Sequence, residues 1–174
     1  MSAVPLYRVL FVCAGNTCRS PLAAAALEHA LGEEGRRVEI QSAGVYASPG
    51  APAATPAIVV GKANGLELSQ HRAQRVSIPL LERADLVLAL GPGELEVVRR
   101  MSPEAGARAH LLTDFDSEHP TGEGVPDPFG GSREAYEECL RRVSEHVGRV
   151  AAVVIREVKA RGEAESASRD RGAA

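Results

Sequence analysis

The chain has 174 residues and a formal net charge of -3, and hydrophobic residues make up 44% of it while charged residues make up 25%. This balance is typical of one soluble globular domain. It excludes the strong basic field of a protein that binds nucleic acid or a membrane surface through charge. The sequence has no run of about 18 apolar residues, the length of a membrane span, and no signal-peptide pattern, so we expect a cytoplasmic protein.

The predicted elements alternate between strands and helices along the chain. Apolar segments predict strands at residues 7–12, 38–44, 84–90 and 110–112. Helical patterns lie at residues 21–31, with Gly32 as the terminal cap, and at 57–63, 91–101 (after a short turn) and 132–160. Residues 1–160 are expected to form a single domain and residues 161–174 a flexible tail.

This alternation implies an α/β fold, with a doubly wound parallel sheet and helices on both of its faces. Such sheets bind ligands beyond the carboxyl ends of their strands. Residues 113–131 are rich in Gly, Pro and Asp and predict a long surface loop. Long loops in compact domains are often functional.

The segment from Cys13 to Arg19 lies between the first predicted strand and its helix, where that rule places a ligand. Gly15 and Asn16 tolerate left-handed backbone conformations, so the loop can curl until its N–H groups form an anion nest beside the helix N-terminus. These groups and the Arg19 cation are expected to lower the pKa of Cys13 and favour its thiolate. The planar Arg19 fork suits bidentate binding of phosphate. The residues expected to bind the anion are Ala14, Gly15, Asn16, Thr17, Cys18 and Arg19.

Several residues around this loop allow two interpretations. An isolated cysteine at a strand end is more often a small buried side chain, but the loop, the arginine and the helix start together favour a nucleophilic Cys13. Ser20 either donates its hydroxyl to the thiolate or caps the helix before Pro21. Cys18 either forms a reversible disulfide with Cys13 that prevents over-oxidation or is a buried side chain. Cys139, inside the last predicted helix, is expected to lie in the core.

The pattern Cys-x5-Arg-Ser-Pro at residues 13–21 strongly resembles that of the low-molecular-weight protein tyrosine phosphatase family. The resemblance covers most of the chain and extends to residues 42–44, 65–76 and 127–136. It implies a three-layer, Rossmann-like sandwich with a four-stranded parallel sheet in the order 2-1-3-4. It also implies a hydrolase that removes phosphate from protein side chains through a cysteinyl-phosphate intermediate, without a metal or cofactor, as a monomer or weak dimer.

Asp127 is the expected general acid, which protonates the leaving group and later activates water. The resemblance assigns this role to the aspartate of an Asp-Pro loop, and Pro128 restricts the backbone there. Alone, an Asp-Pro pair is more typical of an ordinary turn. Asp114 and Asp116 in the same predicted loop are less favoured substitutes for Asp127.

The resemblance also implies a network of hydrogen bonds that supports the loop, formed by Asn16, Ser42 and His71. Without the resemblance, His71 is only a polar residue in a connecting segment.

Two positions bear on the substrate. Thr17 resembles the bacterial protein arginine phosphatase branch, since tyrosine-directed members usually have a bulkier aliphatic residue there. Phe129 is followed by two glycines, whereas tyrosine-directed relatives often have further aromatic residues that enclose a phenyl ring. The acidic residues Asp114, Asp116 and Glu118 are expected to attract a cationic guanidinium. The preferred substrate is therefore protein phosphoarginine, and protein phosphotyrosine is the main alternative.

Functions of other classes fit parts of the pattern. An arsenate reductase on the same scaffold needs further cysteines in a mobile segment, and only Cys139 lies beyond the loop. A phosphate-binding redox sensor without turnover needs no general acid, so the joint presence of Cys13, Arg19 and Asp127 argues against it. The first strand-helix junction matches neither common nucleotide-binding motif.

Overall fold

The apolar run near the N-terminus forms an inner strand of a parallel sheet in the computed structural model, which describes residues 6–172. The strands are β1 (Tyr7–Cys13), β2 (Val38–Gly44), β3 (Leu86–Ala89) and β4 (Ala109–Leu111). Their order is β2-β1-β3-β4, and every neighbouring pair is parallel. The predicted fold class and strand order are confirmed.

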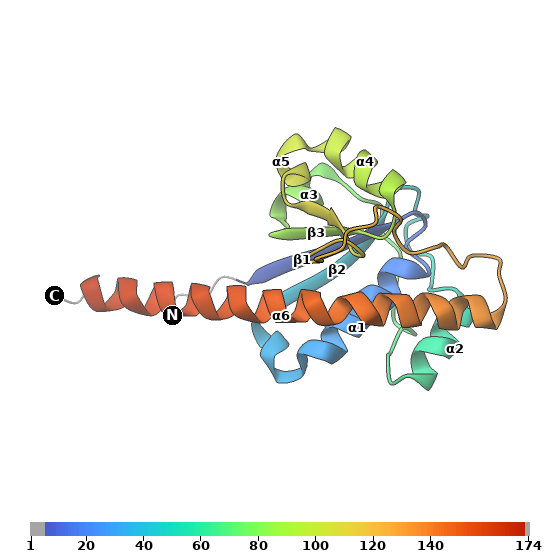
Figure 1. Ribbon diagram of the computed structural model, residues 1–174, viewed down its shortest axis with the longest axis horizontal. Coiled ribbons are helices and arrows are strands. Elements are labelled where there is room, and N and C mark those ends of the chain that lie inside the picture. The colour runs from blue at the N-terminus through green and yellow to red at the C-terminus, as the bar shows by residue number, and fades with distance from the viewer. Residues whose placement is uncertain (1–5, 173–174) are drawn as a thin grey trace.

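Two layers of helices cover the sheet (Figure 1). One layer contains α1 (Arg19–Leu31), α2 (Thr55–Ala63) and α6 (Arg133–Gly172), and the other contains α3 (Ile78–Arg83), α4 (Pro92–Met101) and α5 (Pro103–Gly106). Alternate β1 side chains enter different layers. Phe11 and Cys13 face the layer of α1 and α6, while Leu10 and Val12 face the layer of α4. Since these four side chains are at most 2% exposed, β1 is buried on both faces.

Helix α1 begins at Arg19, two residues before the predicted start at Pro21. The backbone N–H of Leu22 already donates to the Cys18 carbonyl oxygen at 3.2 Å, so the loop passes into the helix without a spacer. Gly32 ends α1 with a φ of 49°, a left-handed value that glycine adopts readily, as predicted for a cap. A 3-10 helix, η1 (Gly32–Arg37), then leads to β2.

Two short helices, α3 and α5, are absent from the sequence prediction. Each begins with a serine cap and a proline in the first turn. The Ser77 hydroxyl accepts from the Leu80 N–H at 3.4 Å, and the Ser102 hydroxyl accepts from the Ala105 N–H at 3.2 Å. Serine followed by proline is a helix-start signal, but segments this short have too few apolar positions to show a helical period.

Residues 161–172, which the sequence predicts as a flexible tail, are helical, because α6 continues to Gly172; residues 173–174 lie outside the described range. Arg161 fixes the start of this extension. Its guanidinium lies 2.8 Å from an Asp85 carboxylate oxygen and 4.7 Å from the centroid of the Tyr7 ring. Although α6 has 40 residues, none of the helices described between residues 6 and 172 combines the length and the apolarity needed to cross a membrane.

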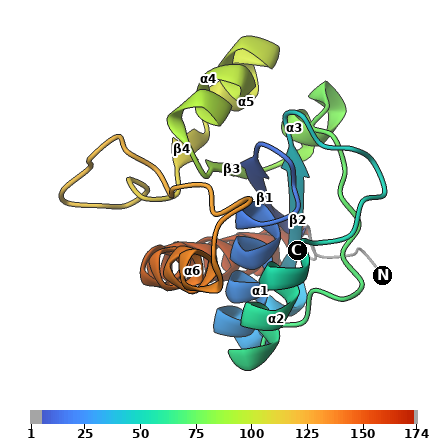
Figure 2. The ribbon, with the colours of Figure 1, turned by 90° about the vertical axis from the view of Figure 1, so that its right-hand side faces the viewer.

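The carboxyl ends of the strands meet at one edge of the sheet, and the loops that follow them lie together there (Figure 2). Cys13 ends β1, Gly44 ends β2, and α4 begins three residues after the end of β3. The segment that follows β4 returns across the same edge, because the Val125 N–H donates to the Leu90 carbonyl oxygen at 2.7 Å. This convergence places the predicted site residues within reach of one another.

Candidate active site

The loop between β1 and α1 wraps around the sulfur of Cys13. The backbone N–H of Asn16 donates to Cys13 Sγ at 3.3 Å, and the Ser20 hydroxyl lies 2.9 Å from the same sulfur. Asn16 has a φ of 55°, so it provides the left-handed turn that the sequence predicts. Gly15 does not have a positive φ. One left-handed residue is therefore enough to curl this loop.

Ser20 contacts the sulfur and does not cap the helix. Its hydroxyl oxygen accepts from Asn16 Nδ2 at 2.8 Å, which leaves its own hydrogen free to point at Cys13 Sγ. Since α1 begins one residue earlier and Cys18 is the residue before it, Ser20 already lies inside the helix. The structure therefore places the Ser20 hydroxyl against Cys13 Sγ, where either atom can be the donor of the bond.

The side chain of Asn16 connects the loop to the neighbouring segments. Its Nδ2 donates to the Ser42 hydroxyl at 2.9 Å, and its Oδ1 accepts from the Gln74 backbone N–H at 2.9 Å. The Asn16 carbonyl oxygen lies 2.6 Å from His71 Nε2, so this ring nitrogen is the protonated one and donates. Burial lowers the pKa of His71, which favours the neutral ring. The structure thus brings Ser42 and His71 to the loop, and adds Gln74.

Gly44 is the last residue of β2, and its surroundings explain why the segment at 42–44 ends in glycine. A Cβ at this position would lie 2.5 Å from the Ala14 carbonyl oxygen and 2.8 Å from the Asn16 nitrogen. Both atoms are backbone atoms of the loop, and they cannot move without opening it. The absent side chain therefore lets β2 support the loop directly.

Replacing Asn16 by alanine is expected to lower the free energy of unfolding by about 2–4 kcal/mol. The substitution leaves the buried Ser42 hydroxyl and Gln74 N–H without this partner, and it places a Cβ-bearing residue with no polar side chain at a positive φ. Urea denaturation measures the change. Asn64→Ala is the matched control, since Asn64 makes one side-chain bond, to the Val60 carbonyl oxygen, at the end of α2. Equal losses in the two variants would contradict the role given to Asn16.

Arg19, the first residue of α1, points its guanidinium back towards the loop and is almost fully buried. Its Nη2 donates to Glu94 Oε1 at 2.8 Å and to Asp127 Oδ2 at 3.3 Å, and its Nη1 donates to the Val125 carbonyl oxygen at 3.2 Å. Its Nε is buried and has no hydrogen-bond partner among the described residues. A buried N–H without a partner is unfavourable, so this donor is suited to an incoming anion.

Burial raises the pKa of the Cys13 thiol above its ordinary value and is the largest influence on it. The Ser20 hydroxyl, the Arg19 charge and the Asn16 N–H favour the thiolate and act in the opposite direction. The sequence predicts a lowered pKa for this thiol, and the structure contradicts that prediction, because burial outweighs the groups that favour the thiolate. A physical reason is that Arg19 pairs with two carboxylates, which offset part of the charge that would otherwise stabilise the thiolate.

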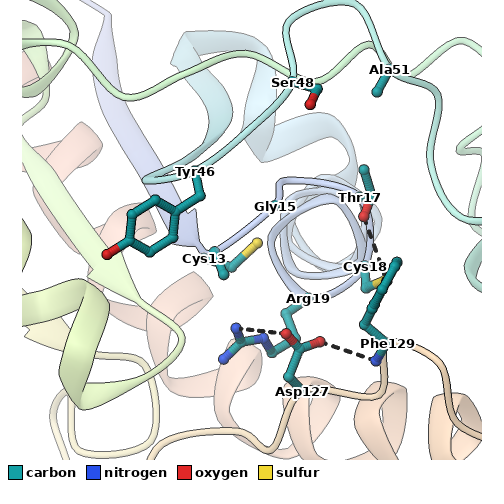
Figure 3. Close-up of a pocket in the computed structure, with 11 residues that line it drawn as sticks. Cys13, Gly15, Thr17, Cys18, Arg19, Tyr46, Ser48, Ala51, Asp127 and Phe129 are labelled. Atoms are coloured by element: carbon teal, nitrogen blue, oxygen red, sulfur yellow. Dashed lines mark hydrogen bonds and ion pairs between the residues drawn. The ribbon is translucent and has the colours of Figure 1, made fainter.

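Asp127 comes to the site from the segment between β4 and α6. Its Oδ2 accepts from Arg19, and its Oδ1 accepts from the backbone N–H of Phe129 at 3.1 Å. The side chain is 44% exposed, so it faces the pocket while one edge is fixed (Figure 3). The Asp-Pro pair makes a local turn bond that also orients the carboxyl group, and the general-acid role of Asp127 stays a prediction.

A pocket of about 340 Å³ opens above the loop. Its lining includes the residues Cys13, Ala14, Gly15, Thr17, Cys18, Arg19, Tyr46 and Asp127, together with Phe129. Tyr46 and Phe129 lie on opposite sides of Cys13, and each is 74% exposed (Figure 3). The sequence singles out Phe129 as a specificity residue and predicts few further aromatic residues at the site, so Tyr46 was missed. The available signal was its position two residues after the carboxyl end of β2, where ligands bind.

Asp114 and Asp116 do not line this pocket. The Asp114 carboxylate accepts from the backbone N–H groups of Thr121 and Gly122 at 2.8 and 2.9 Å, so it stabilises the long loop itself. Asp116 has a φ of 52° and forms part of a turn. Neither residue is positioned to replace Asp127, and Glu118 is also absent from the pocket lining. The expected acidic attraction for a guanidinium therefore does not come from these residues.

The other two cysteines are free and buried. Cys18 Sγ lies 3.5 Å from the Tyr136 hydroxyl, and a disulfide between Cys18 and Cys13 stays a prediction. Cys139 lies on α6 and its side chain is in the hydrophobic core, as predicted, at 3% exposure. Burial raises its pKa to about 12. This thiol has neither the exposure nor the acidity of a redox relay cysteine.

Known proteins resemble this chain in sequence and in fold. A family model described as low molecular weight phosphotyrosine protein phosphatase matches residues 8–160. The chain is 38% identical over 145 residues to a protein-arginine-phosphatase of Geobacillus stearothermophilus, covering 83% of this chain and 94% of that protein. It is also 38% identical over 145 residues to a low molecular weight protein-tyrosine-phosphatase of Streptomyces coelicolor, covering 79% and 87%.

Among solved structures, the YwlE arginine phosphatase from Geobacillus stearothermophilus has a TM-score of 0.79 and 37% sequence identity, covering 87% of this chain and 94% of that chain. The tyrosine phosphatase Wzb from Escherichia coli K30, solved in complex with sulphate, has a TM-score of 0.76 and 31% identity, covering 86% and 99%. By its sequence and its fold, the chain belongs to the low molecular weight phosphotyrosine protein phosphatase family.

Proposed function

We propose that Cys13 attacks the phosphorus of a phosphorylated protein side chain, with Arg19 and the loop binding the phosphoryl oxygens and Asp127 as the general acid. The observation that supports this most is their arrangement around one pocket: Cys13, Arg19 and Asp127 all line it, Arg19 bonds to Asp127, and the Arg19 Nε has no partner among the described residues. Family membership implies a phosphoprotein substrate. Inward N–H groups and a guanidinium supply the charge stabilisation that the transferring phosphoryl group needs.

The proposed reaction has two steps. In the first, the Cys13 thiolate forms a bond to phosphorus, the bond from phosphorus to the side chain breaks, and Asp127 gives its proton to the leaving atom. In the second, Asp127 takes a proton from water as the water oxygen attacks phosphorus. The sulfur–phosphorus bond breaks, the thiolate is restored and inorganic phosphate leaves. Because burial favours the neutral thiol, the Ser20 hydroxyl and Asn16 N–H matter as groups that stabilise the thiolate before attack.

Phosphoarginine is the substrate that we favour. Thr17 lines the pocket and is half-buried, so its small polar side chain leaves room for a branched, planar guanidinium. The relatives include protein-arginine-phosphatases of Geobacillus stearothermophilus and of Bacillus subtilis. The Bacillus subtilis protein is 34% identical to this chain over 148 residues. Asp127 is the carboxylate available to that guanidinium at the rim.

Phosphotyrosine is the second candidate, and a specific observation favours it. The rings of Tyr46 and Phe129 both line the pocket and lie on either side of Cys13, an arrangement that we call the slot (Figure 3). Aromatic rings stack on a phenyl group with a gain of about 0.5–1.5 kcal/mol beyond area burial. A guanidinium also stacks on such rings, so the slot alone does not separate the two substrates.

A substrate comparison tests this choice. We expect the wild type to have a higher kcat/KM for a phosphoarginine peptide than for a phosphotyrosine peptide of the same sequence. Thr17→Ile is expected to lower kcat/KM for phosphoarginine by about 10- to 100-fold, because the larger apolar group crowds the guanidinium. The control is Thr121→Ile, on the exposed loop distant from the pocket lining. A preference for phosphotyrosine that Thr17→Ile leaves unchanged would overturn the phosphoarginine assignment.

The remaining functional alternatives have less support. Arsenate reduction requires thiols that relay oxidation, and Cys139 is buried inside α6 with a raised pKa. A phosphate-binding redox sensor requires no general acid, whereas Asp127 is oriented towards the pocket by two hydrogen bonds. A cytoplasmic location and a monomeric or weakly dimeric state stay predictions from the sequence.

A further inference from the structure

Glu94 makes the closest contact to the Arg19 guanidinium. Its Oε1 lies 2.8 Å from Arg19 Nη2, and the two side chains are only 12% and 7% exposed. Asp127 contacts the same nitrogen at 3.3 Å, but its side chain is 44% exposed. A buried, short ion pair constrains geometry much more than an exposed one, because losing either partner leaves an uncompensated buried charge.

The start of α4 is built around this contact. Glu94 lies in the first turn of α4, where the helix dipole favours a negative side chain. Gly91 precedes that turn, and a Cβ there would lie 2.4 Å from Glu94 Oε2 and 3.3 Å from Arg19 Nη1. A residue other than glycine at position 91 would therefore displace the pair. The Glu94 carboxylate thus occupies the space that a side chain at position 91 would fill.

The contact of Glu94 also determines which guanidinium atoms remain available. Glu94 and Asp127 share Nη2, and the Val125 carbonyl oxygen takes Nη1. The buried Nε is left without a partner among the described residues and belongs to a side chain that lines the pocket. These contacts therefore fix the orientation of the Arg19 guanidinium at the pocket.

We propose that Glu94 is a positioning residue, which fixes the Arg19 guanidinium and offsets part of its charge at the Cys13 thiol; the proposal rests on the function proposed above. Nothing in the sequence pattern of the loop assigns such a role, because Glu94 lies on a different helix, 75 residues from Arg19. The positioning part and the charge part have different consequences, and they can be measured separately.

The charge part concerns every ionisable group that faces Cys13. The ionisable groups that line the same pocket as Cys13 are Arg19, Cys18, Tyr46 and Asp127, and Cys139 on α6 is electrostatically coupled to Cys13. Among them, the Arg19 charge acts to lower the pKa of Cys13. A neutral residue at position 94 offsets that charge less. The pKa of Cys13 should then be lower in such a variant than in the wild type.

The test compares Glu94→Gln, Glu94→Ala and the wild-type enzyme. Glutamine keeps a hydrogen-bond acceptor but removes the charge, whereas alanine removes both. The matched control is Glu96→Gln on the same helix, since Glu96 is 66% exposed and pairs with Arg100. Thermal unfolding of each variant shows that it is folded. Two quantities are then measured: the affinity for inorganic phosphate by calorimetry, and the pH dependence of iodoacetamide alkylation at Cys13 by peptide mapping.

We expect Glu94→Ala to weaken phosphate binding by about tenfold, because a loosened guanidinium loses its orientation. Glu94→Gln should recover most of that affinity, and its alkylation of Cys13 should begin at a lower pH than in the wild type. Unchanged phosphate affinity and an unchanged alkylation profile in folded Glu94→Ala would overturn the proposal. If the wild type binds phosphate but hydrolyses no phosphorylated substrate, the proposed function fails. These two binding and alkylation measurements still decide the role of Glu94.

Discussion

Replacing Cys13 by serine is expected to abolish hydrolysis, with a loss of roughly four orders of magnitude or more in kcat, while inorganic phosphate still binds. Serine keeps the size and hydrogen-bonding of the side chain, so the contacts to Ser20 and Asn16 can persist. A hydroxyl is a far poorer nucleophile and leaving group than a thiolate. Steady-state kinetics measures the loss, and calorimetry with inorganic phosphate measures binding.

The control for this prediction is Cys139→Ser, the same chemical change at another buried cysteine of the core. The folded Cys139→Ser variant should hydrolyse substrate with the kcat of the wild type, and only the fraction of folded protein should change. Loss of phosphate binding together with activity in Cys13→Ser would indicate a collapsed loop, and retained hydrolysis would show that another group is the nucleophile. Either result contradicts the assignment of Cys13.

Replacing Asp127 by alanine should slow hydrolysis in proportion to how much the leaving group needs a proton. For a poor leaving group such as unsubstituted phenol, we expect kcat/KM to fall by about 10²–10³-fold. For an aryl phosphate whose leaving group is stable as an anion, kcat/KM should fall only a few-fold. The reason is that a leaving group that is stable as an anion needs no proton from Asp127. The side chain is half-exposed at the rim of the pocket, where Arg19 and Phe129 hold it, so its loss should leave the core intact.

Asp116→Ala provides the control, because Asp116 occupies a turn in the same segment but is absent from the pocket lining. Its kcat/KM values should match those of the wild type for both esters. Equal losses for both esters in Asp127→Ala would mean that this residue supports the loop structurally and does not transfer a proton.

The fold and the loop are the parts that the sequence predicts well. The apolar run of β1, the Asn16 turn and the Cys-x5-Arg spacing are local features, so their consequences can be derived from adjacent residues. The strand order follows from the resemblance, and the network around Asn16 also does. Gln74 was missed because its contacts, a backbone N–H to Asn16 and a side-chain amide to the Ser42 carbonyl oxygen, join segments that meet only in the folded chain.

The missed parts depend on segments that meet only in the folded chain. In the sequence, Glu94 is one of several charged residues on an amphipathic helix. It reaches Arg19 only because α4 follows β3, which lies beside β1 in the sheet. The pKa of Cys13 depends on the depth at which the loop is buried, which composition does not give. The extension of α6 depends on Asp85 and Tyr7 meeting Arg161 across the sheet.

The central claim is that the Cys13 sulfur carries the phosphoryl group between the two steps. The most direct measurement is a rapid acid quench of the Asp127→Ala variant during turnover of an activated aryl phosphate, followed by phosphorus NMR and peptide mapping. The account predicts one phosphoryl group bound to sulfur at Cys13. A phosphoryl group on any other residue, or continued hydrolysis with none on the protein, would contradict it.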